Sequence, residues 1–210
     1  MAYQPPLPQP VVIEGPSGVL QGIVEAPLTP SAIAVICHPH PLHGGTMTNK
    51  VAHALARSCS ECGMASVRFN YRGVGESAGS YDNGVGETDD ALATVRWAQA
   101  RWPGLAVNLA GFSFGGGVAL RAALQIDCAS LITVAPAVAR DAPPTTLPTC
   151  PWLLVQGDAD DVVPADTVLA WVNALATKPE VKVLAGAGHF FHGRLIELRE
   201  LVRDWRLAQA

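Results

Sequence analysis

The chain lacks long apolar segments and basic clusters, and these two absences exclude several classes of protein. No stretch approaches the roughly 18 consecutive apolar residues of a membrane-spanning helix, so we expect no segment that crosses a bilayer. Residues 1–10 are rich in proline and lack the basic and apolar regions of a secretory signal. The formal net charge is −4 without any concentration of Lys or Arg, so neither a nucleic acid nor an anionic membrane is expected as a partner.

Cysteine is scarce, irregularly spaced and odd in number. The cysteines are Cys37, Cys59, Cys62, Cys128 and Cys150. An odd count at irregular spacing argues against a disulfide framework and for a reducing compartment, so we predict a cytoplasmic protein. Cys59 and Cys62 form a C-x-x-C, but without a second pair or thioredoxin-like surroundings we interpret it as ordinary helix packing.

Phosphate-binding and metal-binding patterns are missing or weak. No G-x-G-x-x-G lies between a strand and a helix, and no G-x-x-x-x-G-K-[ST] occurs, so the glycines around 73–75 and 115–117 are interpreted as turns and close packing. His38, His40 and His43 stand close together, but no carboxylate at ligand spacing accompanies them. We therefore expect neither a metal nor another cofactor.

The sequence does contain enough apolar material for one sizeable core. It has 210 residues, of which 49% are apolar and 15% charged, as in an ordinary globular protein. We predict one domain over residues 1–210, with the Pro-rich residues 1–9 as a loose arm.

Apolar periodicity predicts an alternation of strands and helices. Strands are expected at 11–14, 19–25, 32–37, 65–70, 105–110, 131–135, 152–156 and 181–185. Helices are expected at 47–62, 87–101, 116–124, 165–176 and 194–208. The first two strands flank a Gly-Pro-Ser-Gly turn and should form an antiparallel hairpin. The remaining order is typical of an α/β fold: a mostly parallel central sheet of about eight strands with helices on both faces.

The most specific local pattern is Gly111-Phe112-Ser113-Phe114-Gly115, which joins a predicted strand to a predicted helix. A serine with glycines two residues before and after it can occupy a sharp strand-to-helix turn, where its backbone is strained and its hydroxyl is held in the open. The glycines are needed because a Cβ at either position would crowd the neighbouring strand or helix. We interpret Ser113 as a nucleophile.

A serine hydroxyl needs a base to take its proton, and the base needs a carboxylate to orient it. His189 follows the predicted strand 181–185 and is our candidate base. Three aspartates, Asp158, Asp160 and Asp161, crowd the loop after the strand 152–156. Serine, aspartate and histidine thus occur in that order, each just after a strand.

Besides these loops, three segments carry a resemblance to a known family: residues 37–47, residues 69–77 and Gly111–Gly117, which contains the serine turn. With the Asp and His loops, they make the chain resemble the α/β-hydrolases over nearly its whole length, and closely the small bacterial carboxylesterase-type serine hydrolases without a lid. The resemblance implies an α/β-hydrolase fold without a cap domain and a Ser-Asp-His triad. The family pattern D-x-x-V-P places the acid at Asp160, with Asp161 as the next candidate.

Hydrolysis by such a triad also needs two N–H donors for the oxyanion. One should be the backbone N–H of Phe114, directly after the nucleophile. The other should come from the loop after the strand 32–37, where two prolines have no N–H to donate and leave His40 or Leu42. Because a proline occupies the Gly position of the family's H-G-x loop, the resemblance favours His40. We expect His38 to hold the loop backbone.

Residues 136–151 are rich in proline and too short for a cap, so we predict an open, shallow, apolar cleft next to Phe114. Its expected walls are Leu42, Met47, Tyr71, Phe190 and Phe191. The predicted activity is hydrolysis of short-chain carboxylic esters, small-molecule substrates, through an acyl-enzyme on Ser113. The same triad could serve a thioesterase, a peptidase, an acyltransferase or a perhydrolase, and a fold of this kind can also be a non-catalytic binding module. The sequence leaves the oligomeric state undetermined.

Overall fold

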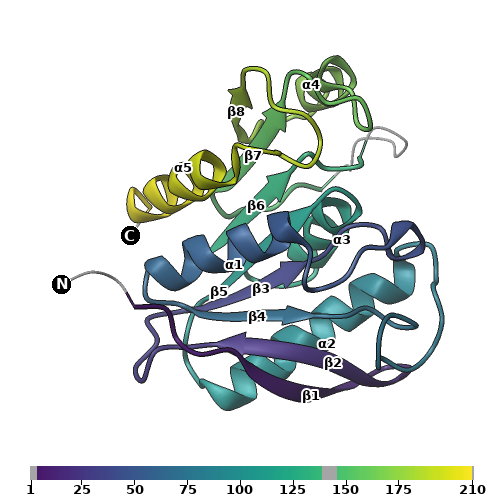
Figure 1. Cartoon of the computed structure of the whole chain (residues 1–210), viewed down its shortest axis with the longest axis vertical. Coiled ribbons are helices and arrows are strands. Elements are labelled where there is room, and N and C mark those ends of the chain that lie inside the picture. The colour runs from purple at the N-terminus through teal and green to yellow at the C-terminus, as the bar shows by residue number, and fades with distance from the viewer. Residues whose placement is uncertain (1–3, 139–145, 210) are drawn as a thin grey trace.

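The computed structural model describes residues 4–138 and 146–209, and its centre is an eight-stranded sheet in the order β1-β2-β4-β3-β5-β6-β7-β8 (Figure 1). The strands are β1 (Gln9–Gly15), β2 (Gly18–Glu25), β3 (Ile33–Cys37), β4 (Ala65–Phe69), β5 (Val107–Phe112), β6 (Ser130–Val134), β7 (Trp152–Gly157) and β8 (Glu180–Leu184). The β1–β2 and β2–β4 pairs are antiparallel, and every later pair is parallel. The hairpin and the mostly parallel sheet predicted from the sequence are thus confirmed.

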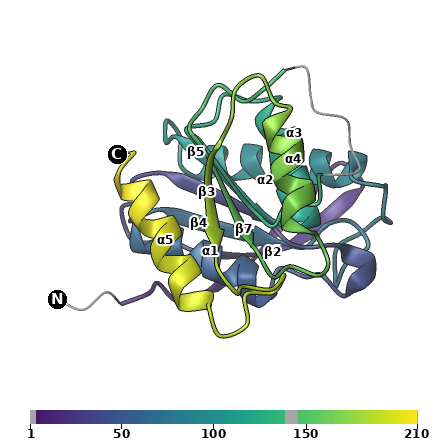
Figure 2. The same ribbon diagram turned by 90° about the horizontal axis from the view of Figure 1, so that it is seen from above.

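Helices cover both faces of this sheet. They are α1 (Lys50–Glu61), α2 (Val85–Arg101), α3 (Phe114–Ala123), α4 (Ala165–Asn173) and α5 (Leu195–Leu207), with a short 3-10 helix at Pro41–His43. Helices α1 and α5 pack on one face and α2, α3 and α4 on the other, as Figure 2 shows. No helix among residues 4–138 and 146–209 is both long and apolar enough to cross a bilayer.

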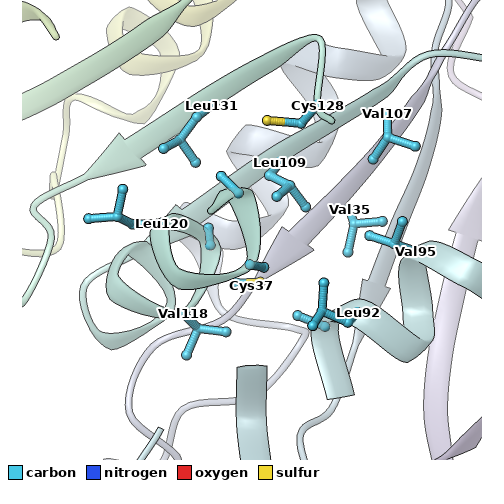
Figure 3. Close-up of a cluster of buried hydrophobic side chains, with 14 of the residues drawn as sticks. Val35, Cys37, Leu92, Val95, Val107, Leu109, Val118, Leu120, Cys128 and Leu131 are labelled. Carbon is cyan, nitrogen blue, oxygen red and sulfur yellow. The ribbon is translucent and has the colours of Figure 1, made fainter. Parts of the chain in front are cut away.

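The parallel strands are apolar throughout because both of their faces are covered. All five residues of β3 are buried, and successive side chains enter opposite cores. Figure 3 shows the core under α2 and α3, where Val35 and Leu109 from the sheet lie near Leu92 and Val95 from α2. Such layers fix the strands, and the strands fix the loops that leave their ends.

Element boundaries differ from the predicted ones by a few residues, for local reasons. Helix α1 begins at Lys50 rather than at 47, because the Asn49 Oδ1 accepts hydrogen bonds from the Val51 and Ala52 amides at 2.9 and 3.3 Å and so caps the helix. Helix α2 begins two residues early, since the Glu87 carboxylate reaches back to the Gly84 amide at 2.6 Å. The sequence predicts no cap domain within residues 136–151. Of this segment, residues 139–145 lie outside the residues that the structure describes.

Candidate active site

The site lies where the parallel strands end at their carboxyl sides, and Ser113 is its centre. Ser113 joins β5 to α3 with φ 56° and ψ −120°, a strained conformation for a residue with a side chain. A Cβ on Gly111 would stand 2.0 Å from the Gly115 carbonyl oxygen, and a Cβ on Gly115 would stand 2.3 Å from the Cys37 carbonyl oxygen. The two glycines therefore allow the close helix–strand approach on which this turn depends, as expected from the sequence.

His189 and Asp160 arrive from the loops after β8 and β7. The His189 Nε2 lies 3.1 Å from the Ser113 Oγ, and the His189 Nδ1 lies 2.8 Å from the Asp160 Oδ2. All three side chains are largely buried. The structure thus brings together the three residues that the sequence proposed as nucleophile, base and acid.

The environment of Asp160 favours its charged form. Its Oδ1 accepts hydrogen bonds from the Val162 and Val163 amides at 2.9 and 2.7 Å, and the Gln156 Nε2 donates to its Oδ2 at 3.1 Å. Burial acts to raise the pKa of Asp160, but the hydrogen bonds from His189 and from the two amides outweigh it and leave this pKa below its ordinary value. An ionised Asp160 can hold the imidazole with its proton on Nδ1, which leaves Nε2 as the acceptor that faces Ser113.

The two other aspartates of this loop have different positions. The Asp158 Oδ1 accepts a hydrogen bond from the Gly186 amide at 2.5 Å and so ties the loop after β7 to the loop after β8. Asp161 is exposed. Within the part of the chain that the structure describes, Asp160 is the only one of the three that contacts His189.

His38 lies behind the loop that follows β3. Its Nδ1 is 2.7 Å from the Pro39 carbonyl oxygen, and its Nε2 accepts from the Tyr71 amide at 3.2 Å. Because the amide can only donate, Nε2 must be unprotonated and Nδ1 must carry the hydrogen. Burial lowers the pKa of His38 to about 3, so the ring is neutral and acts as a fixed brace for this loop.

A cavity of about 770 Å³ opens beside Ser113. It is lined by His40, Leu42, His43, Tyr81, Asn83, Ser113, Phe114, Gly117, Arg121, Ala137, Val162, Val163, Pro164 and Thr167. Leu42 and Phe114 lie in this lining as expected. The sequence analysis did not identify the residues that line the cavity from the loop before α2, from α3 beyond Phe114 and from the start of α4.

Three predicted cleft residues are buried instead, and the prediction was wrong for them. The Tyr71 ring packs against His38, with ring centroids 4.1 Å apart, beneath the loop rather than beside its mouth. Met47 is held inward because its amide donates to Asn70 at 2.8 Å. Phe191 adopts φ 51° and enters the core with α5. Phe190 is 44% exposed and packs on His189, outside the residues that line the cavity.

One sequence signal could have found two of the missed residues. Gly117 and Arg121 follow Ser113 at intervals of four, which places them one and two turns further along the same side of α3. Tyr81 and Asn83 come from an irregular loop with no periodicity to reveal their direction. The Tyr81 hydroxyl lies 3.3 Å from the His40 Nε2, so this loop closes one side of the cavity.

The three neighbouring histidines do not converge on one point. The rings of His40 and His43 stack with centroids 4.5 Å apart, while His38 uses both ring nitrogens in the loop. Among the described residues, no group of three His, Cys, Asp or Glu side chains could hold a metal ion.

Comparison with known proteins extends these observations. A family model described as serine aminopeptidase, S33, matches residues 30–148. The solved structure of an α/β serine hydrolase homologue from Coxiella burnetii is 47% identical, with 97% of this chain and 99% of that chain covered and a TM-score of 0.90. XC6422 from Xanthomonas campestris, an α/β serine hydrolase without lid, is 39% identical, with 97% and 95% covered and a TM-score of 0.89.

A curated relative agrees over a similar length. The uncharacterized protein RP471 from Rickettsia prowazekii is 35% identical over 211 residues, which cover 95% of this chain and 88% of the relative. Together with the sheet order and the strained serine after β5, these matches lead to one assignment. The chain belongs to the α/β-hydrolase superfamily and is a serine hydrolase.

Proposed function

We propose that the protein hydrolyses carboxylic esters with short acyl chains, and that Ser113, His189 and Asp160 are its catalytic triad. The observation that carries this proposal is the continuous hydrogen-bonded chain from the Ser113 Oγ through His189 to Asp160, at distances of 3.1 and 2.8 Å, beside an open cavity. A hydroxyl, an imidazole and a carboxylate in this order activate an oxygen nucleophile at neutral pH.

In the proposed reaction the Ser113 Oγ attacks the ester carbonyl carbon while the His189 Nε2 takes the hydroxyl proton. Asp160 stabilises the imidazolium that forms. His189 then gives its proton to the departing alcohol, which leaves an acyl group on Ser113. A water molecule, deprotonated by His189, attacks this acyl-enzyme and releases the carboxylic acid.

The charge on the carbonyl oxygen needs N–H donors near Ser113. We assign one to Phe114, which is the first residue of α3, where the backbone N–H has no partner within the helix. For the second donor we propose the His40 amide, which the resemblance to the family's H-G-x loop favours, and not the Leu42 amide, which donates to the His40 Nδ1 at 3.2 Å. Each donor would contribute roughly 3 kcal/mol to lowering the barrier.

The lining of the cavity supports a small substrate. It includes apolar residues such as Leu42, Phe114 and Val162 and polar ones such as Tyr81 and Asn83. The apolar side chains can bury an acyl chain of a few carbons, which needs only one apolar pocket.

Aminopeptidase activity is the second candidate, because the matching family model is described as a serine aminopeptidase. An aminopeptidase must hold the positively charged amino terminus of its substrate, which calls for a carboxylate near the nucleophile. Among the described residues that line the cavity none is Asp or Glu. A lining of this kind favours the ester over a peptide with a free amino terminus.

Turnover of p-nitrophenyl esters from C2 to C12 and of amino-acid p-nitroanilides separates the two candidates. We expect the C2–C6 esters to react fastest, and Ser113→Ala to reduce kcat/KM by roughly 10⁴-fold or more. Ser17→Ala, in the exposed β1–β2 turn, is the matched control and should behave as the parent. Esterase turnover that survives in Ser113→Ala would refute the triad, and nitroanilides that react faster than every ester would favour the peptidase.

A further inference from the structure

Away from the active site, two cysteines from distant parts of the sequence lie side by side. The Cys128 Sγ and the Cys150 Sγ are 3.0 Å apart. Cys128 precedes β6 and Cys150 precedes β7, and these two strands are parallel neighbours. The proximity of the two thiols is therefore a consequence of the sheet.

The surrounding hydrogen bonds hold both segments in register. Leu131 pairs with Trp152, and the Leu131 amide donates to the Pro151 carbonyl oxygen at 3.0 Å. Cys128 is part of the buried core near Leu131 (Figure 3), and Cys150 packs against that core from a partly exposed position. A disulfide bond is about 2 Å long, so the sulfurs need to approach by only about 1 Å, which side-chain rotation can supply.

We propose that Cys128 and Cys150 form a reversible intramolecular disulfide, with a low-molecular-weight disulfide such as oxidised glutathione as the oxidant. The site is independent of the proposed function, because both sulfurs lie at the amino ends of their strands. Ser113 and Asp160, in contrast, follow the carboxyl ends of β5 and β7.

The environment of the two thiols sets the order of the steps. The hydrogen bond between them raises the pKa of Cys128 and lowers the pKa of Cys150, and Cys150 is also the more exposed. The Cys150 thiolate therefore attacks oxidised glutathione, forms a mixed disulfide and expels one glutathione thiolate. Cys128 then loses its proton, attacks the Cys150 Sγ and expels the second glutathione. Two protein thiols are oxidised, and one glutathione disulfide is reduced to two glutathione molecules.

The bond would join residues that are 22 positions apart and so restrict the unfolded chain. For a loop of this size in a protein of about 200 residues, the melting temperature should rise by roughly 7–14 °C. The distance of the bond from Ser113 leads us to expect the same rate of p-nitrophenyl acetate hydrolysis before and after oxidation.

The test incubates the folded full-length chain with oxidised glutathione, blocks the remaining thiols and maps the tryptic peptides. We expect peptide 122–140 linked to peptide 141–182, an intact mass lower by two hydrogens, and the rise in melting temperature. Cys150→Ser and Cys128→Ala should each abolish the rise, whereas Cys62→Ser, at another half-buried cysteine, should retain it.

Three results would overturn the proposal: a stable glutathione adduct on Cys150 without closure, a link between other cysteines, or an unchanged melting temperature in the linked protein. Because peptide mapping and melting do not depend on turnover, a protein without esterase activity would contradict the proposed function and leave this test intact.

Discussion

Replacing His38 with Ala tests whether this buried side chain orients the second oxyanion donor. The His38 Nδ1–H donates to the Pro39 carbonyl oxygen at 2.7 Å. That carbonyl and the His40 N–H belong to the same peptide unit, which is planar, so a bond that fixes one end also fixes the direction of the other. The other ring nitrogen, which accepts from the Tyr71 amide, anchors the imidazole to the end of β4.

The substitution should lower two quantities, the free energy of unfolding and kcat. The Pro39 carbonyl and the Tyr71 amide would both lose a buried partner, at about 1–3 kcal/mol each, so the free energy of unfolding should fall by roughly 2–6 kcal/mol. A misdirected His40 N–H would forfeit part of the roughly 3 kcal/mol that one donor supplies, which lowers kcat by about 10- to 100-fold. KM should change little, because the donor acts mainly on the transition state.

The assay combines steady-state hydrolysis of p-nitrophenyl acetate, well below the melting temperature, with unfolding in urea. His53→Ala, at an exposed histidine of α1, serves as the control and should leave both quantities near those of the parent. A His38→Ala protein that loses stability as expected but keeps its kcat would refute the reasoning. His38 would then support the loop without orienting a donor, and the assignment of His40 would fail.

Three further predictions use the same measurements. Asp160→Asn should lower kcat by roughly 10⁴-fold. Asp161→Asn, at an exposed carboxylate, is the control and should leave kcat near the parent value. Equal losses of kcat in the two variants would contradict the assignment of Asp160 as the acid. Gly115→Ala would place a Cβ 2.3 Å from a carbonyl oxygen at the end of β3 and should lower the free energy of unfolding in urea by about 1–3 kcal/mol or more. Gly117→Ala would place a Cβ no closer than 3.4 Å to the atoms around it and should lower this free energy far less. Burial lowers the pKa of His38 from 6.5 to about 3, so between these pH values this side chain binds a proton in the unfolded chain but not in the folded chain. The contribution of His38 to the free energy of unfolding should therefore be fully present above pH 6.5 and fall by about 1.4 kcal/mol per pH unit as the pH is lowered through this window. Urea unfolding at several pH values should show this slope, and the same slope in a His38→Ala protein would contradict its origin.

The meeting of serine, histidine and aspartate could be predicted from the sequence because each depends on a local pattern. Glycines at 111 and 115 indicated a turn, and loops after apolar runs indicated strand ends. In a mostly parallel sheet these ends share one edge, so the residues meet without any knowledge of distant contacts. The spacing of Asp160 from Val163 was also local, and the Val163 amide binds this carboxylate at 2.7 Å.

The walls of the cavity could not be predicted in this way, since they depend on the direction of single side chains. Phe190 and Phe191 are neighbours in sequence, yet one is half-exposed and the other fully buried, because Phe191 has a positive φ that no sequence pattern indicated. Tyr71 follows a strand and so was expected at the mouth. Its ring instead lies edge-on to Phe69 and Phe114, at 5.2 and 5.8 Å between centroids.

The separation between the hydrogen-bonded chain and the cavity walls has a practical consequence. Asn83 and Thr167 face the cavity from segments that carry none of the three side chains of the proposed triad. A mutant library restricted to these positions could therefore be screened for altered acyl preference while the chemistry stays constant. For an engineer, this chain is a scaffold in which selectivity and rate can be optimised one after the other.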